Sequence, residues 1–225
     1  MLINGKTVDD GPIAKNTIYV IRKRRDIYFI EPQENDEDDK IIISYDLKPK
    51  QYGIFVHEYR PGFINKNNIK TSDILILVID EDEKKYSSWI LDVKVTVGGE
   101  DVIFKLLEQL CDSYKHKNSI GAYLPELKEE EHIGFITRDY QENRIRMKII
   151  EKEEYVNRER RNMEKMPPSM KNSIQIKILK MEKDVKILKD FLNGYIEIRN
   201  ILHPIEKYMS VREGNENICR LNVFV

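Results

Sequence analysis

Two apolar runs joined by a charged turn are the most informative stretch of the sequence. The first is Thr71-Ser-Asp-Ile-Leu-Ile-Leu-Val-Ile-Asp80, and the second begins Ser88-Trp-Ile-Leu-Asp-Val-Lys94. Their near-continuous apolar character predicts a hairpin of two strands, at residues 73–80 and 87–97, buried on both faces within a mixed sheet. Each run nevertheless carries an acid in an otherwise apolar setting, and these acids need an explanation.

The chain after this hairpin alternates between helical and extended patterns. Gly98-Gly99 ends the second strand, and Glu100 and Asp101 suit the first turn of a helix that ends near Tyr114. Its apolar row has helical spacing and consists of Val102, Leu106, Leu107, Leu110 and Tyr114. We expect a short strand at 119–124, a charged loop at 126–131, a strand at 132–137, and a strand at 145–150 that pairs with it.

The first 70 residues are predicted to form a β-rich N-terminal region. Residues 17–30 contain two β-type runs around a basic turn, which predicts a hairpin. An acidic, exposed loop is expected at 31–40, and further strands at 41–45 and 54–59. A separate core that contains the central hairpin is assigned to residues 71–150.

The last 75 residues, 151–225, are predicted to be a charged linker and a helical segment. Residues 151–165 are almost entirely charged, and Pro167-Pro168 follows. Residues 170–202 then carry a heptad seam from Ile174 to Tyr195, which predicts a long helix ended by Pro204. A second apolar stripe favours packing of this helix into a bundle or onto the sheet. A homo-oligomer through residues 174–202 also remains open, because the sequence does not say whether the helix packs within its own chain or against another.

Composition limits the function classes. The 225 residues are 40% apolar and 34% charged with a net charge of −1, so any contact with nucleic acid must come from a local basic patch. The two cysteines, Cys111 and Cys219, form no CxxC pair, which argues against a zinc cluster and favours a reducing compartment. Without a signal-type leader or an apolar run of roughly 20 residues, we expect a cytoplasmic protein with no membrane partner.

The acids of the hairpin and a neighbouring lysine point to metal-dependent phosphodiester chemistry. Period-2 alternation places Asp92 and Lys94 on one face of a strand, roughly 7 Å apart. If the turn lies near residues 82–83, Asp73 shares their neighbourhood. Two buried acids repel each other unless a cation lies between them. Carboxylate oxygens favour Mg²⁺ or Mn²⁺, which would polarise a phosphate and lower the pKa of a bound water.

The same residues resemble a known family. Ser72-Asp73, eighteen residues, and then Asp92-Val-Lys94 is similar to the motif of the PD-(D/E)XK nuclease superfamily, with Ser72 where proline is frequent. The run from Trp89 to Pro125 looks more particularly like the nuclease-like domain of McrC-type restriction and defence proteins. The resemblance implies a restriction-endonuclease-like mixed sheet flanked by helices and Mg²⁺-dependent cleavage of DNA, with Asp73 and Asp92 as metal ligands and Lys94 as the catalytic lysine.

The resemblance also implies accessory groups, and here the sequence departs from the family pattern. Gln109 is similar to a helix glutamine near the site in some relatives, although its spacing to Tyr114 differs by one residue from QxxxY. Relatives also have a helix before the first strand that often supplies a glutamate. This region reads as β-rich here, and Glu58 is the one obvious substitute. A nucleotide-hydrolysing partner subunit is a further expectation.

Several alternatives remain open at this level. Asp92 and Lys94 are also compatible with a plain hairpin whose charges pair on a solvated face. The basic residues Arg22, Lys23, Arg24 and Arg25 could contact DNA, but a basic hairpin tip is more often ordinary surface. The alternating Arg144, Arg146 and Lys148 fit a DNA-facing strand or an edge-strand charge row equally well. The first functional hypothesis is an enzyme, a restriction or anti-phage endonuclease. The alternative hypothesis is a catalytically inactive nuclease-like fold that acts as an adaptor through its C-terminal helix.

Overall fold

The predicted central hairpin forms the middle of the structure. The protein is described by a computed structural model over residues 17–21, 25–31, 39–45, 51–57, 72–121, 127–213 and 216–223. Strands β5 (Ile74–Asp80) and β6 (Lys85–Val97) pair in antiparallel register around an exposed turn at residues 81–84. Asp80 ends β5 beside this turn, where it is buried and accepts backbone hydrogen bonds from Asp82 and Glu83.

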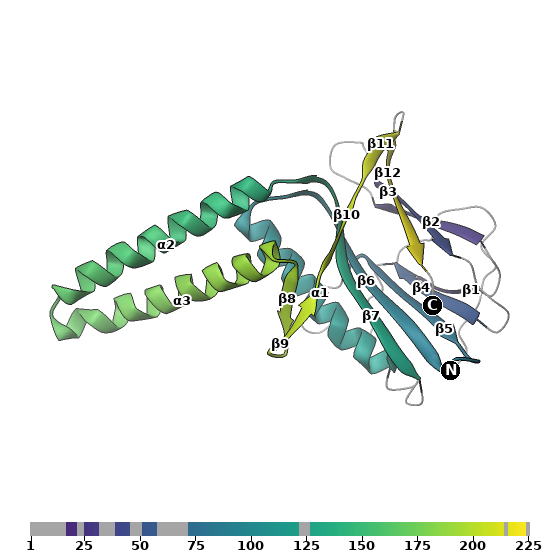
Figure 1. Cartoon of the computed structure of the whole chain (residues 1–225), viewed down its shortest axis with the longest axis horizontal. Coiled ribbons are helices and arrows are strands. Elements are labelled where there is room, and N and C mark those ends of the chain that lie inside the picture. Colours follow the sequence, from purple (N-terminus) through teal and green to yellow (C-terminus); the bar gives the residue numbers. More distant parts are fainter. Residues whose placement is uncertain are drawn as a thin grey trace. The chain divides into compact units, whose positions relative to one another are not determined.

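The hairpin lies within a six-stranded mixed sheet, so the predicted α/β class with a mixed sheet flanked by helices is confirmed (Figure 1). The strand order is β1-β4-β5-β6-β7-β10. On one side lie β4 (Gln51–His57) and β1 (Thr17–Ile21), each antiparallel to its neighbour. On the other side lie β7 (Lys128–Tyr140) and β10 (Glu206–Met209), which are parallel to each other.

Helix α1 (Glu100–Gly121) connects β6 to β7. The backbone N–H of Lys128 donates to the Lys84 carbonyl at one end of the strand pair, and the Thr137 hydroxyl donates to the Val95 carbonyl near the other end. Strands β6 and β7 therefore run parallel, which requires a crossover connection such as α1. The buried row of α1 is Ile103, Leu106, Leu110, Ser113 and Lys117. This helix continues past the expected end at Tyr114, which overturns the predicted strand for residues 119–121; residues 122–126 lie outside the description.

Two predictions near β7 were wrong. Residues 128–131 of the expected charged loop are the start of β7. Residues 145–150, expected as a strand, belong to helix α2 (Glu142–Glu164), which also includes most of the predicted linker. The buried row Ile145, Ile149, Lys152 and Val156 has helical spacing. Lys152 interrupts its apolar pattern in the sequence and is compensated in the structure by Glu100 at 2.6 Å and Asp184 at 3.1 Å.

The N-terminal strands form, but they do not make the predicted hairpin. Strand β1 pairs with β4, whereas β2 (Arg25–Glu31) pairs with β3 (Asp39–Tyr45) in a different sheet. This second sheet has the order β11-β12-β3-β2 and includes β11 (Val211–Glu213) and β12 (Glu216–Val223). Residues near the C-terminus therefore pair with strands near the N-terminus, which no local pattern indicates. The acidic segment 32–38 lies outside the described residues.

Helices α2 and α3 (Pro168–Leu192) form an antiparallel pair (Figure 1). Ion pairs from Glu153 to Lys189 and from Arg160 to Glu182 fix their direction. The buried positions of the predicted seam include Ile178, Val185 and Leu188, and they pack in cis. The helix ends at Leu192, ten residues before the prediction.

A small hairpin replaces the last turns of the predicted helix. Gly194, with φ of 81°, follows α3, and β8 (Tyr195–Ile198) pairs with β9 (Ile201–Pro204). Arg199 and Asn200 both have positive φ, as a two-residue hairpin turn requires. Pro204 therefore lies in a strand and does not end a helix.

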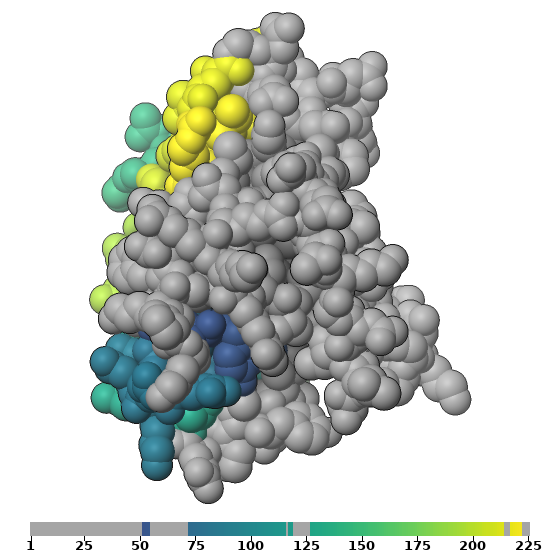
Figure 2. Space-filling model, turned by 90° about the vertical axis from the view of Figure 1, so that its right-hand side faces the viewer, coloured from purple at the N-terminus to yellow at the C-terminus, as the bar shows by residue number. Residues whose placement is uncertain are grey.

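The chain divides into two compact units that differ from the three consecutive segments predicted. One contains residues 1–96, 105–139 and 206–225; the other contains 97–104 and 140–205. Figure 2 shows residues 51–54 of β4 (dark blue) beside the teal hairpin that starts at residue 72, as the pairing of β4 with β5 requires. Among the described residues, none of the helices combines the length and apolar character needed to cross a bilayer.

Candidate functional site

The register of the central hairpin places Asp73 opposite Asp92. Ile74 pairs with Leu91, so one further step along the antiparallel ladder brings the residue before β5 level with Asp92. Both carboxylates belong to the first compact unit and are buried. The structure therefore brings together the two acids that are 19 positions apart in the sequence.

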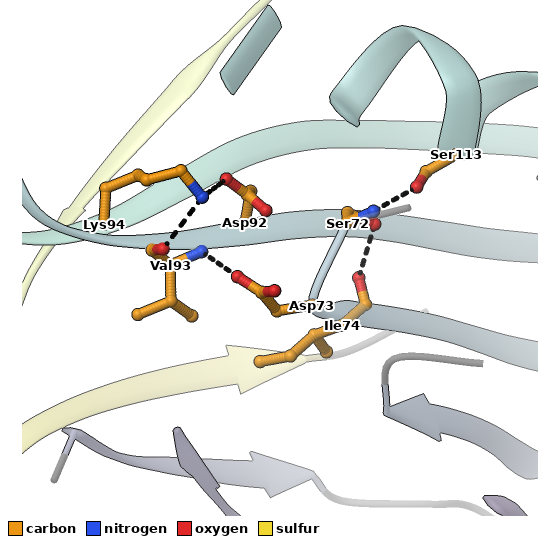
Figure 3. A network of polar contacts seen from close by, with 7 residues as sticks. All are labelled: Ser72, Asp73, Ile74, Asp92, Val93, Lys94 and Ser113. Atoms are coloured by element: carbon orange, nitrogen blue, oxygen red, sulfur yellow. Dashed lines mark hydrogen bonds and ion pairs between the residues drawn. The ribbon is translucent and has the colours of Figure 1, made fainter. Parts of the chain in front are cut away.

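Asp73 is held by backbone contacts on both sides (Figure 3). Its Oδ2 accepts a hydrogen bond of 2.6 Å from the backbone N–H of Val93. The preceding backbone N–H, that of Ser72, donates to Ser113 Oγ on α1 at 2.5 Å. The hairpin and the crossover helix together set the position of the Asp73 carboxylate, and Ser113 is a positioning residue that the sequence did not reveal.

Asp92 and Lys94 lie on the same face of β6, as the period-2 pattern predicts. The Asp92 side chain is fully buried, and Lys94 Nζ pairs with its Oδ2 (Figure 3). The same ammonium donates to the backbone oxygen of Val93 at 3.1 Å. The Lys94 side chain is 16% exposed, so the lysine is the member of this trio that reaches toward solvent.

The electrostatics of the trio leave Asp92 undercompensated. Burial raises the pKa of the Asp92 carboxyl well above its ordinary value, the adjacent Asp73 raises it further, and Lys94 opposes both. The Asp73 and Asp92 carboxyls are within hydrogen-bonding reach of each other, which for two acids requires a shared proton or a cation. Asp92 Oδ1 is buried and has no hydrogen-bond partner. Such an orphaned charged oxygen is costly in a protein interior.

These residues fit a small divalent cation. Two carboxylates, one with an orphaned oxygen, and the nearby Val93 carbonyl are hard oxygen donors, and Mg²⁺ is often held by only one or two carboxylates together with waters and substrate phosphates. Asp73 and Asp92 would hold such an ion. Within the described part of the chain, no cluster of three or more His, Cys, Asp or Glu side chains has a metal-binding arrangement.

The unfavourable position of Asp92 leads to a stability prediction. In metal-free buffer near neutral pH, Asp92→Asn should raise the melting temperature by several degrees, because it removes a buried carboxyl whose pKa is raised in the fold. In a domain of this size, each kcal/mol of stability changes the melting temperature by roughly 2–4 °C. A group with a raised pKa stabilises the fold below its unfolded value, about 3.8 here, and loses that contribution as the pH rises. The gain from Asp92→Asn should therefore vanish at low pH, as measured by thermal denaturation across a pH series.

Asp80 is a matched control for this prediction. It is also a buried acid of the same hairpin, but backbone hydrogen bonds, that of Glu83 first, lower the pKa of its carboxyl, and Gln51 contributes at 2.6 Å. Its charged form stabilises the fold above the unfolded pKa, and this stabilisation is lost as the pH falls. Asp80→Asn should lower the melting temperature at neutral pH. Two shifts of the same sign would contradict the assignment of Asp92 as a strained charge.

Most of the other predicted accessory and DNA-contact residues fall outside the part of the chain that the structure describes. Glu58, Arg22, Lys23 and Arg24 lie outside the described residues, and so does the side chain of Arg25. Gln109 is half-buried on α1.

The predicted strand face of basic residues does not exist, because Arg144, Arg146 and Lys148 lie on helix α2. There Arg146 pairs with Glu142 at 2.6 Å and Lys148 with Glu151 at 2.9 Å. Alternating spacing had favoured a strand, and the helix distributes these side chains around its axis instead.

A second polar cluster lies between α1 and β7, one helical turn after Ser113, and sequence reasoning missed it. Lys117 is 1% exposed and its Nζ lies 2.6 Å from carboxylate oxygens of both Glu129 and Glu131 on β7. The ammonium is also 4.3 Å from the centre of the Tyr114 ring. Burial alone would raise the pKa of the Glu129 carboxyl, but hydrogen bonds, that of Lys117 first, hold it below its ordinary value. Both carboxylates of this cluster accept a hydrogen bond from Lys117, in contrast to the orphaned Oδ1 of Asp92.

Comparisons with known proteins add no relative to this picture. No family model matches the chain, and neither a curated protein nor a solved structure does.

Proposed function

We propose that this protein is a Mg²⁺-dependent endonuclease that cleaves DNA phosphodiester bonds, in a restriction or anti-phage setting. The observation that carries the proposal is the buried, undercompensated Asp92 beside Asp73, with Lys94 on the same strand face. A structural ion pair would be expected to satisfy its acids, as the Lys117 cluster does. The mixed sheet flanked by helices is the architecture that the sequence resemblance implies.

Asp73, Asp92 and Lys94 would have different roles in phosphodiester cleavage. When bound between Asp73 and Asp92, the ion would polarise the scissile phosphate and lower the pKa of a water. The backbone N–H of Val93 and the Ser72–Ser113 contact hold Asp73 in place for this role. Lys94 places a positive charge at the exposed side of the trio, where it would stabilise the charge that develops on the phosphoryl oxygens as the water attacks.

Metal dependence is the direct test of this proposal. Supercoiled plasmid incubated with the purified protein and Mg²⁺ or Mn²⁺ should be nicked or linearised, and EDTA should stop the reaction. Asp92→Asn should remove both the cutting and the heat of Mn²⁺ binding in calorimetry. The Asp80→Asn protein provides the control, because Asp80 lies at the opposite end of β5 from Asp73 and should leave both signals intact. Absence of Mn²⁺ binding by the wild type would rule out the metal site.

A non-enzymatic role is the second candidate, and one observation favours it. The helical unit exposes large apolar side chains on α2 and α3, among them Met147 and Ile176, which is typical of a binding surface. In this role a nuclease-like fold would act as an assembly or adaptor subunit, for example with a nucleotide-hydrolysing partner. A chain that binds Mn²⁺ but leaves plasmid intact, alone and after addition of cell extract, would favour this alternative.

A further inference from the structure

An exposed acidic patch lies on helix α2. Met147 and Ile150 are 56% and 45% exposed, which is unusual for side chains of this size on a well-formed helix. Two exposed glutamates, Glu151 and Glu154, continue the same row. The four residues are spaced i, i+3, i+4 and i+7, so they form one continuous face of the helix. We call these four residues the acidic patch.

Helix α3 carries a patch with the same spacing and the opposite charge. Ile176 and Leu179 are 67% and 55% exposed, and the exposed Lys180 and Lys183 follow them. This basic patch repeats the order of the acidic patch position by position: apolar, apolar, charged, charged. The exposed charged side chains of α3 are all lysines, because Glu182, Asp184 and Asp190 are half-buried.

The outer residues of both patches point away from the interior of the helical pair, whereas Ile150 adjoins a groove that Lys189 and Leu192 also line. Each residue turns an α-helix by about 100°, so Met147 and Glu154 lie on the side of α2 opposite the buried row of Ile149 and Val156. The same rotation places Ile176 and Lys183 opposite the buried row of α3 that contains Val185. The two patches of one chain therefore face outward from different helices and do not contact each other.

The charges of the patches are available for a partner. Lys180, Lys183 and Glu154 make no ion pair with any residue in the described ranges, and Glu151 pairs only with Lys148 of its own helix at 2.9 Å. Elsewhere on the helical pair, Lys189 is bridged to Glu153 and Arg160 to Glu182. A surface of two large apolar side chains flanked by uncompensated lysines matches an apolar and acidic helix, and the chain itself supplies one.

We propose that a second copy of this chain covers the basic patch, with its own acidic patch as the contacting surface. Laid side by side in parallel, α3 of one copy and α2 of the next align Ile176 with Met147 and Leu179 with Ile150. The same register places Lys180 against Glu151 and Lys183 against Glu154. Apolar side chains then fill the centre of the contact, and ion pairs of complementary sign set its register and exclude other alignments.

The contact is heterologous, since it joins two different surfaces. In a pair, one copy keeps its acidic patch unused and the other keeps its basic patch unused, so the association continues to further copies until a ring closes or a short array forms. Four residues on each side make a small interface, and its affinity should be in the micromolar range. The contact therefore forms at high local concentration, for example when several copies are gathered on one DNA molecule or one partner.

Charge reversal provides a test with an internal complement. Analytical ultracentrifugation of the full chain should show an average mass that rises with concentration up to about 100 µM. The variant K180E/K183E has two acidic patches and E151K/E154K has two basic ones, so each alone should stay monomeric. An equimolar mixture of the two variants should associate again, and so should the chain that carries all four changes.

Two controls keep this test specific. Lys165 and Lys177 are exposed lysines outside the basic patch, and K165E/K177E makes the same change of net charge without altering either patch, so its association should be unchanged. A wild-type chain that remains monomeric at every concentration would overturn the proposal. It would also be overturned if the two reversed variants failed to associate when mixed, or if K180E/K183E lost retention on DNA while the mass of the wild type stayed constant.

Discussion

Replacing Lys94 by alanine is expected to lower metal-dependent DNA cleavage by at least about 100-fold, the usual effect of removing one preorganised group that stabilises developing charge. Lys94 is the trio's cation and its most exposed member, so it faces the place where a phosphate would approach. The protein should remain folded, because Asp92 can take up a proton when its partner is removed. Initial rates of plasmid nicking at saturating Mg²⁺, together with thermal denaturation, measure both effects.

Two comparisons separate catalysis from metal loading in this experiment. Mn²⁺ binding should persist in Lys94→Ala but disappear in Asp92→Asn, since Asp92 would be a ligand and Lys94 would not. Lys85 is the matched control: it lies on the same strand, pairs with Glu83 at 3.2 Å, and is far along β6 from Asp92. Lys85→Ala should cut at the wild-type rate. Cutting by Lys94→Ala at that rate would refute the catalytic assignment.

The largest effect on stability is expected at Lys117. Lys117→Met should lower the free energy of unfolding by about 3–5 kcal/mol, because it leaves Glu129 and Glu131 facing each other with no cation between them. Methionine keeps most of the side-chain volume, so the loss reports the charge and not a cavity. Chemical denaturation at neutral pH measures the difference.

A pH series and a compensating variant identify the cause of this loss. Once the Glu129 carboxyl is protonated the repulsion is absent, so the destabilisation by Lys117→Met should shrink as the pH falls. Glu129→Gln and Glu131→Gln added to Lys117→Met should recover most of the stability at neutral pH, since a neutral cluster needs no cation. If this triple variant were no more stable than Lys117→Met alone, the loss would come from packing.

Local patterns were reliable where one repeat period dominated. Continuous apolar runs predicted β5 and β6, and the period of two placed Asp92 and Lys94 on one face, as the structure has them. The Gly98-Gly99 boundary and the acids after it correctly predicted the start of α1. These predictions rest on interactions between residues close in the chain, which a short window of sequence contains.

Predictions failed where a charged residue interrupted the decisive pattern. Lys152 occupies a buried position of α2, so its helical row did not stand out, and the alternation of Arg144, Arg146 and Lys148 favoured a strand. The signal for the β8–β9 hairpin was present in Gly194 and in the alternation of Tyr195 to Ile198, but the heptad seam before it extended the predicted helix too far.

By itself, the sequence determined the central hairpin, its turn, the crossover helix and the identity of the three candidate catalytic residues. Only the tertiary structure decided that β1 pairs with β4 and that β10 joins the sheet beside β7. It brought Ser113 and Lys117, both on α1, into contact with Ser72 and Glu129 respectively. It also decided the full burial of Asp92 and its orphaned oxygen. The physical reason is that burial and strand pairing depend on contacts between residues far apart in the chain. Whether a buried carboxylate is stabilised or destabilised depends on the charges and hydrogen-bond donors that those distant residues place around it.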